Sequence, residues 1–155
     1  MNQVRQFPKI AARNLERQDV TLPEAFEGAR NVVMIAFQQR HQALVDSWVP
    51  WLESIAISDS EFRFYEIPTI GRIWSPFRSF IDGGMAAAIR EPVILRRTLT
   101  VYGDVSRLTA PLGITNRSTI HVLAVDHQYR VRRIVRGAFS ESSAREIVGA
   151  FQEPS

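Results

Sequence analysis

Three polar residues that follow an apolar segment are the first candidates for chemistry. The apolar run Val32–Phe37 leads into Arg40, His41 and Gln42, where the sequence predicts the start of a helix. A helix N-terminus presents unpaired N–H groups and favours anions, so these three residues could hold a carboxylate or a phosphate. A solvated helix start is the alternative interpretation, and it is the commoner outcome.

The missing residue types exclude several chemistries. The chain has 155 residues and no cysteine, which excludes a thiolate nucleophile, a dithiol redox centre, an iron–sulfur cluster and cysteine-ligated zinc. His41, His121 and His127 never pair at a three- or four-residue spacing with another ligand, and no hydrolase or Gly-rich phosphate motif occurs. We therefore predict no metal and no cofactor, and we expect His121 to be a hydrogen-bonded core histidine.

The charge pattern gives one basic run. The chain has 19 Lys and Arg against 16 Asp and Glu, a net charge of +3. The densest basic run is Arg130, Arg132, Arg133 and Arg136. No aromatic residues alternate with these arginines as they do in single-strand binding surfaces, so we expect no nucleic-acid partner and a solvated sheet edge instead.

A second candidate surface lies in mid-chain. A helix is predicted over 72–89, and its aromatic and basic residues spread beyond one face. The candidate partner surface consists of Arg72, Trp74, Phe77, Arg78 and Phe80. Aromatic and arginine side chains are enriched in interface hot spots, so this segment could bind a protein or touch a membrane surface.

The periodicity of apolar residues predicts one α/β domain. The expected strands are 31–37, 62–67, 98–102, 119–125 and 129–135, and the expected helices are 39–55, 72–89, 104–108 and 140–151. Parallel crossovers followed by a closing hairpin give a mixed central sheet flanked by helices on both faces. We expect residues 1–18 to form an N-terminal arm and residues 19–155 to form a single domain. No apolar run approaches the roughly 20 residues of a membrane span, and we expect a cytoplasmic protein.

This order, together with particular residues, resembles the thioredoxin-like superfamily, in its TlpA-like and peroxiredoxin-like branch with a mid-chain β-α insertion. The match covers 20–52: a V-x-L piece, Gly28 and an apolar strand that ends in Phe37. The family continues with W-C-x-x-C and then P-x-L, which Pro50 and Leu52 match. In this frame Gln42 and Val45 stand at the two cysteine positions.

Two departures from the family pattern bear on function. Both cysteine positions are replaced, so the resemblance implies the fold without disulfide exchange. The segment 113–119 contains no proline, whereas the family has a cis-proline there that shapes a groove for extended peptides. The segments 74–80 and 120–137 are also similar to the Cys-poor thioredoxin-like family that includes the mitochondrial ATP synthase assembly chaperone.

These observations predict a non-redox thioredoxin-like protein that acts by binding, as an assembly factor, chaperone or interaction module with a protein partner. The alternative is an enzyme that uses a remodelled pocket at Arg40, His41 and Gln42 on an anionic small molecule.

Overall fold

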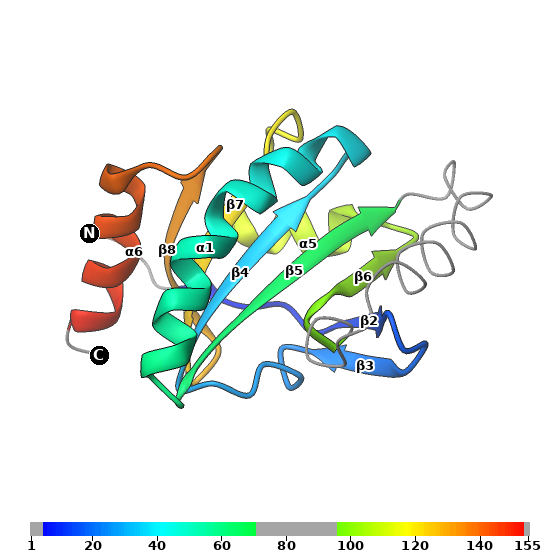
Figure 1. The fold of residues 1–155 in the computed structure, drawn as a ribbon. Coiled ribbons are helices and arrows are strands. Elements are labelled where there is room, and N and C mark those ends of the chain that lie inside the picture. Colours follow the sequence, from blue (N-terminus) through cyan, green and yellow to red (C-terminus); the bar gives the residue numbers. More distant parts are fainter. Residues whose placement is uncertain (1–4, 71–95, 154–155) are drawn as a thin grey trace.

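Strand β4 (Arg30–Ala36) is the centre of the structure, a computed structural model that describes residues 5–70 and 96–153 (Figure 1). Its side chains are apolar on both faces: Val33 and Ile35 pack into one hydrophobic cluster, and Val32 and Met34 pack into another. All four are at most 1% exposed. This is the doubly buried strand that the sequence predicts.

The described strands form one mixed sheet of eight, in the order β1-β8-β7-β4-β5-β6-β2-β3. Strand β4 pairs in parallel with β5 and antiparallel with β7. The other strand bounds are β1 Arg5–Gln6, β2 Ile10–Asn14, β3 Asp19–Leu22, β5 Phe62–Ile70, β6 Leu99–Tyr102, β7 His121–Asp126 and β8 Arg130–Arg136.

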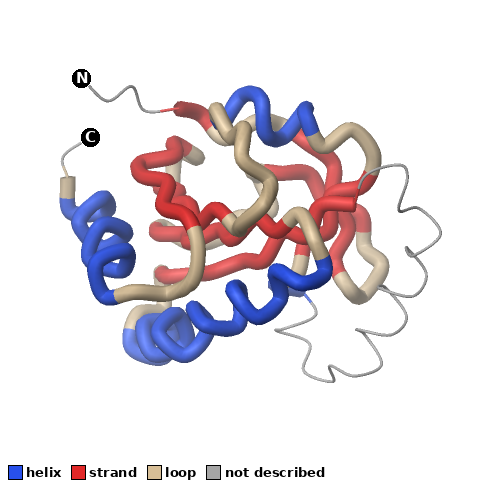
Figure 2. The backbone as a smooth tube through the Cα atoms, turned by 90° about the horizontal axis from the view of Figure 1, so that it is seen from above, coloured by secondary structure: helices blue, strands red, loops and turns tan. Residues whose placement is uncertain are grey.

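Helices cover both faces of the sheet, as Figure 2 shows from above. Helix α1 (Gln42–Ser58), preceded by the short 3-10 helix η1 (Gln39–His41), and α6 (Glu141–Gln152) pack on one face through Trp48, Leu52 and Ile147. Helix α5 (Ser106–Leu112) packs on the other face through Leu108 and Leu112. The expected α/β layers are confirmed.

Several local expectations need correction at the element ends. Strand β5 does not stop at Pro68 but continues to Ile70, and the Thr69 hydroxyl donates to Ala36 O at 2.9 Å. Helix α5 runs past 108 to Leu112 and ends where Gly113 adopts a left-handed conformation with φ 69°. In α6, the helix predicted over 140–151 begins after Ser140, whose hydroxyl accepts the Ser143 N–H and caps the helix, and Val148 is 38% exposed.

The first eighteen residues contribute to the sheet where an arm without strands was expected. Strand β1 pairs with β8, and β2 lies between β3 and β6. Strand β8 is therefore covered at its start by β1 instead of forming the outermost strand. The predicted helix 72–89, with Arg72, Trp74, Phe77, Arg78 and Phe80, lies outside the described residues.

The two ends of the sheet are the regions that matter for function. We define the upper end, as drawn in Figure 1, as Gln38–Gln42, the loop 113–120 and Arg136, which meet beyond the last residue of β4. The lower end comprises Arg30 and the turns 59–61 and 126–129. No helix in the described part of the chain is long and apolar enough to cross a membrane.

Candidate functional site

His41 is a structural residue in the interior of the upper end. Its side chain is 0% exposed, and its Nδ1 accepts the Phe37 N–H at 3.1 Å. The ring proton is therefore on Nε2, which lies 3.1 Å from Ser118 O. Burial lowers the pKa of His41, and the positive charge of Arg40 lowers it further. A neutral imidazole with both nitrogens engaged has neither a free base nor a free donor for a ligand.

His121, the first residue of β7, repeats this arrangement. It is 4% exposed, and its Nε2 donates to Asn116 O over 2.6 Å. Burial also lowers the pKa of His121. The Phe37 ring contacts both imidazoles, with centroid distances of 6.4 Å to His41 and 5.9 Å to His121. His121 is thus the hydrogen-bonded core histidine that the strand pattern predicts.

The loop 113–120 is held by hydrogen bonds from the two buried imidazoles and from the exposed side chain of Gln38. Three successive carbonyl groups accept hydrogen bonds: Asn116 O from His121, Arg117 O from the Gln38 amide at 3.4 Å, and Ser118 O from His41. The Asn116 side chain also accepts the Ser118 N–H at 2.8 Å. The sequence resemblance predicts the family's cis-proline loop at this place, and here two of the carbonyl groups accept hydrogen bonds from buried imidazoles.

Three main-chain N–H groups of the same loop form no hydrogen bond with the described residues. The main-chain N–H groups of Thr115, Asn116 and Arg117 donate to no acceptor within the described residues, and all three residues are exposed. The upper end therefore presents a short row of hydrogen-bond donors on a loop whose inner side is fixed.

Three arginines at the upper end have no ion-pair partner in the described part of the chain. Arg40 bonds the Gln38 side chain, Arg117 bonds Thr109 Oγ1 at 3.2 Å, and exposed Arg136 lies opposite His121 across β7 and β8. None of the three has a carboxylate within ion-pair distance among residues 5–70 and 96–153.

The other arginines of the basic run on β8 are neutralised. Arg130 and Arg132 pair with Asp126 at 3.1 and 3.5 Å, and Arg133 pairs with Glu153 at 2.7 Å. The run is therefore not a continuous phosphate-binding surface, and of its four arginines only Arg136 has no carboxylate partner among the described residues.

The two positions that match the family's cysteines differ in exposure. Gln42 begins α1, is exposed and donates to Asp46 Oδ1 at 2.9 Å, whereas Val45 is 1% exposed and packs in the core. The pocket of Arg40, His41 and Gln42 that the sequence suggests is not assembled as three converging side chains, because His41 faces inward and the other two face solvent.

Glu66 is a residue that the sequence interpretation missed. It lies on β5, and burial raises its pKa to about 7, with the Asp46 charge adding to the rise and the Gln42 hydrogen bond opposing it. The sequence does contain a sign of this residue: Glu66 is the one acidic residue in the strand sequence FRFYEIPTI. Glu66 is therefore a carboxyl group that changes charge near neutral pH, within hydrogen-bond reach of Gln42.

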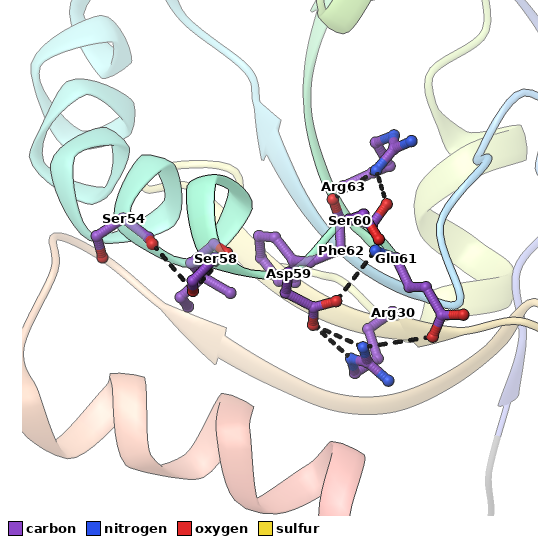
Figure 3. Close-up of polar contacts among 9 residues, drawn as sticks. Arg30, Ser54, Ser58, Asp59, Ser60, Glu61, Phe62 and Arg63 are labelled. Atoms are coloured by element: carbon purple, nitrogen blue, oxygen red, sulfur yellow. Dashed lines mark hydrogen bonds and ion pairs between the residues drawn. The ribbon is translucent and has the colours of Figure 1, made fainter.

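The lower end is built from satisfied ion pairs and local hydrogen bonds (Figure 3). Arg30 donates to Asp59 Oδ2 from Nη2 at 2.6 Å and from Nε at 3.2 Å, and it lies 3.7 Å from Glu61. The Arg30 hydrogen bond lowers the pKa of Asp59. Arg63 donates to the carbonyl groups of Ser60 and Phe62. No set of three or more His, Asp or Glu residues in the described ranges is placed to hold a metal ion.

Comparisons with known proteins identify the fold through structure. No protein-family model matches the sequence, and no curated protein sequence matches it. Among solved structures, BsSco, a member of the Sco family of cytochrome c oxidase assembly proteins, is similar with a TM-score of 0.64 at 11% identity, over 98% of this chain and 95% of that chain.

Two further similar structures are thiol-disulfide proteins. A putative thiol:disulfide interchange protein DsbE from Chlorobium tepidum matches with a TM-score of 0.62 at 10% identity, over 97% of this chain and 98% of that one. The thioredoxin domain of a thiol-disulfide oxidoreductase from Bacteroides vulgatus matches with a TM-score of 0.59 at 18% identity, over 99% of each chain. The narrower similarity to the ATP synthase assembly chaperones finds no support in these matches. The architecture and these matches together show that this cysteine-free chain has the thioredoxin-like fold.

Proposed function

We propose that this protein is a non-redox thioredoxin-like binding protein whose upper end contacts a protein partner. The observation that carries the proposal is the loop 113–120. The buried imidazoles of His41 and His121 and the exposed amide of Gln38 donate to its carbonyl groups, and its N–H groups at 115–117 have no acceptor among the described residues. A pre-organised backbone of this kind loses little conformational entropy when a partner binds.

The alternative of an enzyme acting on an anionic small molecule has less support from the geometry. Its acid–base group would be His41, but that imidazole is buried and uses both ring nitrogens inside the protein. Gln42 is engaged with Asp46. Binding without catalysis fits these contacts better, because it needs the exposed face of the loop and no free imidazole.

An assembly role is the more specific form of the proposal. BsSco belongs to a family of assembly proteins and has the same fold, which makes such work compatible with this architecture but supports it by analogy alone. The mid-chain surface at Arg72, Trp74, Phe77, Arg78 and Phe80 remains a second predicted contact region, and the cytoplasm remains the predicted compartment.

Affinity capture from the native host tests the proposal when it is run with two bulky surface variants. Thr115→Trp places a large side chain on the exposed loop, and the matched control Ser54→Trp places the same side chain on the exposed face of α1. We expect a discrete host protein to be captured by the wild type and by Ser54→Trp but lost with Thr115→Trp. Equal capture by both variants, or a copurified metabolite without a protein, would contradict the proposal.

A further inference from the structure

We infer that the partner segment bound at the upper end is acidic, and that its carboxylates are recognised by the loop amides of Thr115, Asn116 and Arg117 and by the arginines Arg40, Arg117 and Arg136. The inference rests on the proposed function and names the chemistry of the partner. Two independent features of the upper end, one in the backbone and one in the side chains, select the same charge.

The backbone feature is the orientation of the loop. Three successive carbonyl groups, at 116–118, already accept hydrogen bonds from buried His121, exposed Gln38 and buried His41, whereas the N–H groups at 115–117 have no acceptor in the described ranges. An extended partner backbone would need both donors and acceptors, whereas at Asn116 and Arg117 the main chain offers an N–H group without an acceptor beside a carbonyl group that already accepts a hydrogen bond. Groups that only accept hydrogen bonds, such as ionised carboxylates, complement it, and clustered backbone N–H groups bind anions.

The side-chain feature is the unpaired positive charge. Arg40, Arg117 and Arg136 lack a carboxylate partner within residues 5–70 and 96–153, although seven other arginines of the same chain have one. Neither η1 nor the first turn of α1 contains an acidic residue. Guanidinium groups bind carboxylates in two-point contacts, and such charge-assisted bonds are stronger than neutral ones.

The surroundings favour an acidic polypeptide over other anions. Phe37, the aromatic ring at this end, lies between the two imidazoles and is not a free stacking platform for bases. The large exposed apolar residues of the described chain are Ile57, near the end of α1, and Val148 on α6, so the described residues of the upper end provide no apolar anchor for a membrane.

Binding of a labelled octaglutamate peptide, followed by fluorescence anisotropy at low salt, tests the inference. The double variant Arg40→Gln, Arg136→Gln removes two upper-end charges. The control Arg63→Gln, Arg145→Gln removes two charges elsewhere, at exposed residues that form no ion pair within residues 5–70 and 96–153. We expect the upper-end variant to bind about 10- to 100-fold more weakly and the control to bind within about twofold of the wild type. Octaglutamine should not bind, and salt should weaken the octaglutamate complex.

An NMR spectrum of the backbone amides of the wild type tests the inference without a variant, in case a variant folds poorly. Adding octaglutamate to the ¹⁵N-labelled wild type should shift the amide signals of Thr115, Asn116 and Arg117. Shifts confined to other residues, equal weakening in both double variants, or tighter binding of oligothymidylate or phosphatidylserine vesicles at the same salt would overturn the inference. A host partner that is lost with Thr115→Trp but retained by the Arg40, Arg136 variant would overturn it while leaving the proposed function intact.

Discussion

The two ends of the central sheet use arginine in opposite ways. At the lower end, Arg30 holds Asp59 and Glu61, while Arg130 and Arg132 share Asp126. At the upper end, Arg40 and Arg136 have no such acid among the described residues. There the hydrogen bonds of two neutral histidines, His41 and His121, hold the loop 113–120 instead. Arginines without a carboxylate partner among the described residues also occur elsewhere, as at Arg63 and Arg145, but at the upper end they surround a loop whose N–H groups at 115–117 also have no acceptor in the described ranges. This combination makes the upper end the region available to another molecule.

The largest change in the free energy of unfolding should come from removing the His41 imidazole, which bonds the loop 113–120 to the end of β4. His41→Ala leaves the Phe37 N–H and Ser118 O without partners and opens a cavity, so it should lower the free energy of unfolding by about 3–4 kcal/mol. His127→Ala, in the exposed turn of the lower end, should change it by less than about 0.5 kcal/mol. Urea denaturation of both variants makes the comparison. Equal small losses would show that His41 does not hold the loop.

Replacing Glu66 should raise the free energy of unfolding, by a smaller amount than His41→Ala lowers it. The fold raises the pKa of this carboxyl group from 4.5 to about 7, so its contribution to stability is lost as pH rises through that interval. Glu66→Gln keeps the shape without the charge. It should raise the free energy of unfolding by about 1–2 kcal/mol at pH 8 and leave it nearly unchanged at pH 4. A variant that is destabilised at pH 8 would show that the ionised form is the favoured one.

The histidines of the upper end predict a further, smaller pH dependence. Because burial lowers the pKa of His41 and of His121 below 6.5, the unfolded chain takes up protons first as the pH falls. The contribution of the two neutral histidines to the free energy of unfolding should therefore be fully present above pH 6.5 and should be lost as the pH falls below it. Replacing both with Gln removes this decline, and denaturation at pH 7.5 and 5.5 measures it. An unchanged decline in the double variant would place its origin elsewhere.

The smallest effect is expected at the lower end. Asp59→Asn breaks the ion pair with Arg30. Because the side chains of Asp59 and Arg30 are 30% and 38% exposed, solvent screens this pair, and the free energy of unfolding should fall only slightly. Partner binding should not change. If Asp59→Asn lost the host partner as completely as Thr115→Trp does, the functional contrast between the two ends would be wrong.

The sequence predicts the central elements because their signals are local. Strand β4 is apolar on both faces, and Ser140 stands directly before the apolar stripe of α6. Strand β2 was not predicted, since the short segment IAARN has little alternation and depends on pairing with β3 and β6.

The candidate site could be located from the sequence but its geometry could not. The polar residues 38–42 suggest an exposed helix start, whereas His41 is buried by its contact with Ser118, 77 residues away in the chain. The inward direction of the loop carbonyls depends on the same long-range contacts. Arg136 could be recognised as basic, but that its neighbours on β8 are neutralised by Asp126 and Glu153 follows only from the packing of β7 and α6.

Photo-crosslinking from single positions tests the central claim most directly. The photoreactive residue p-benzoylphenylalanine would replace Thr115 at the upper end in one protein and Arg63 at the lower end in another, and each would be irradiated in extract of the native host. We predict a discrete crosslinked polypeptide from position 115, suppressed by excess octaglutamate, and none from position 63. The same polypeptide from both positions, or one from position 63 alone, would contradict the account.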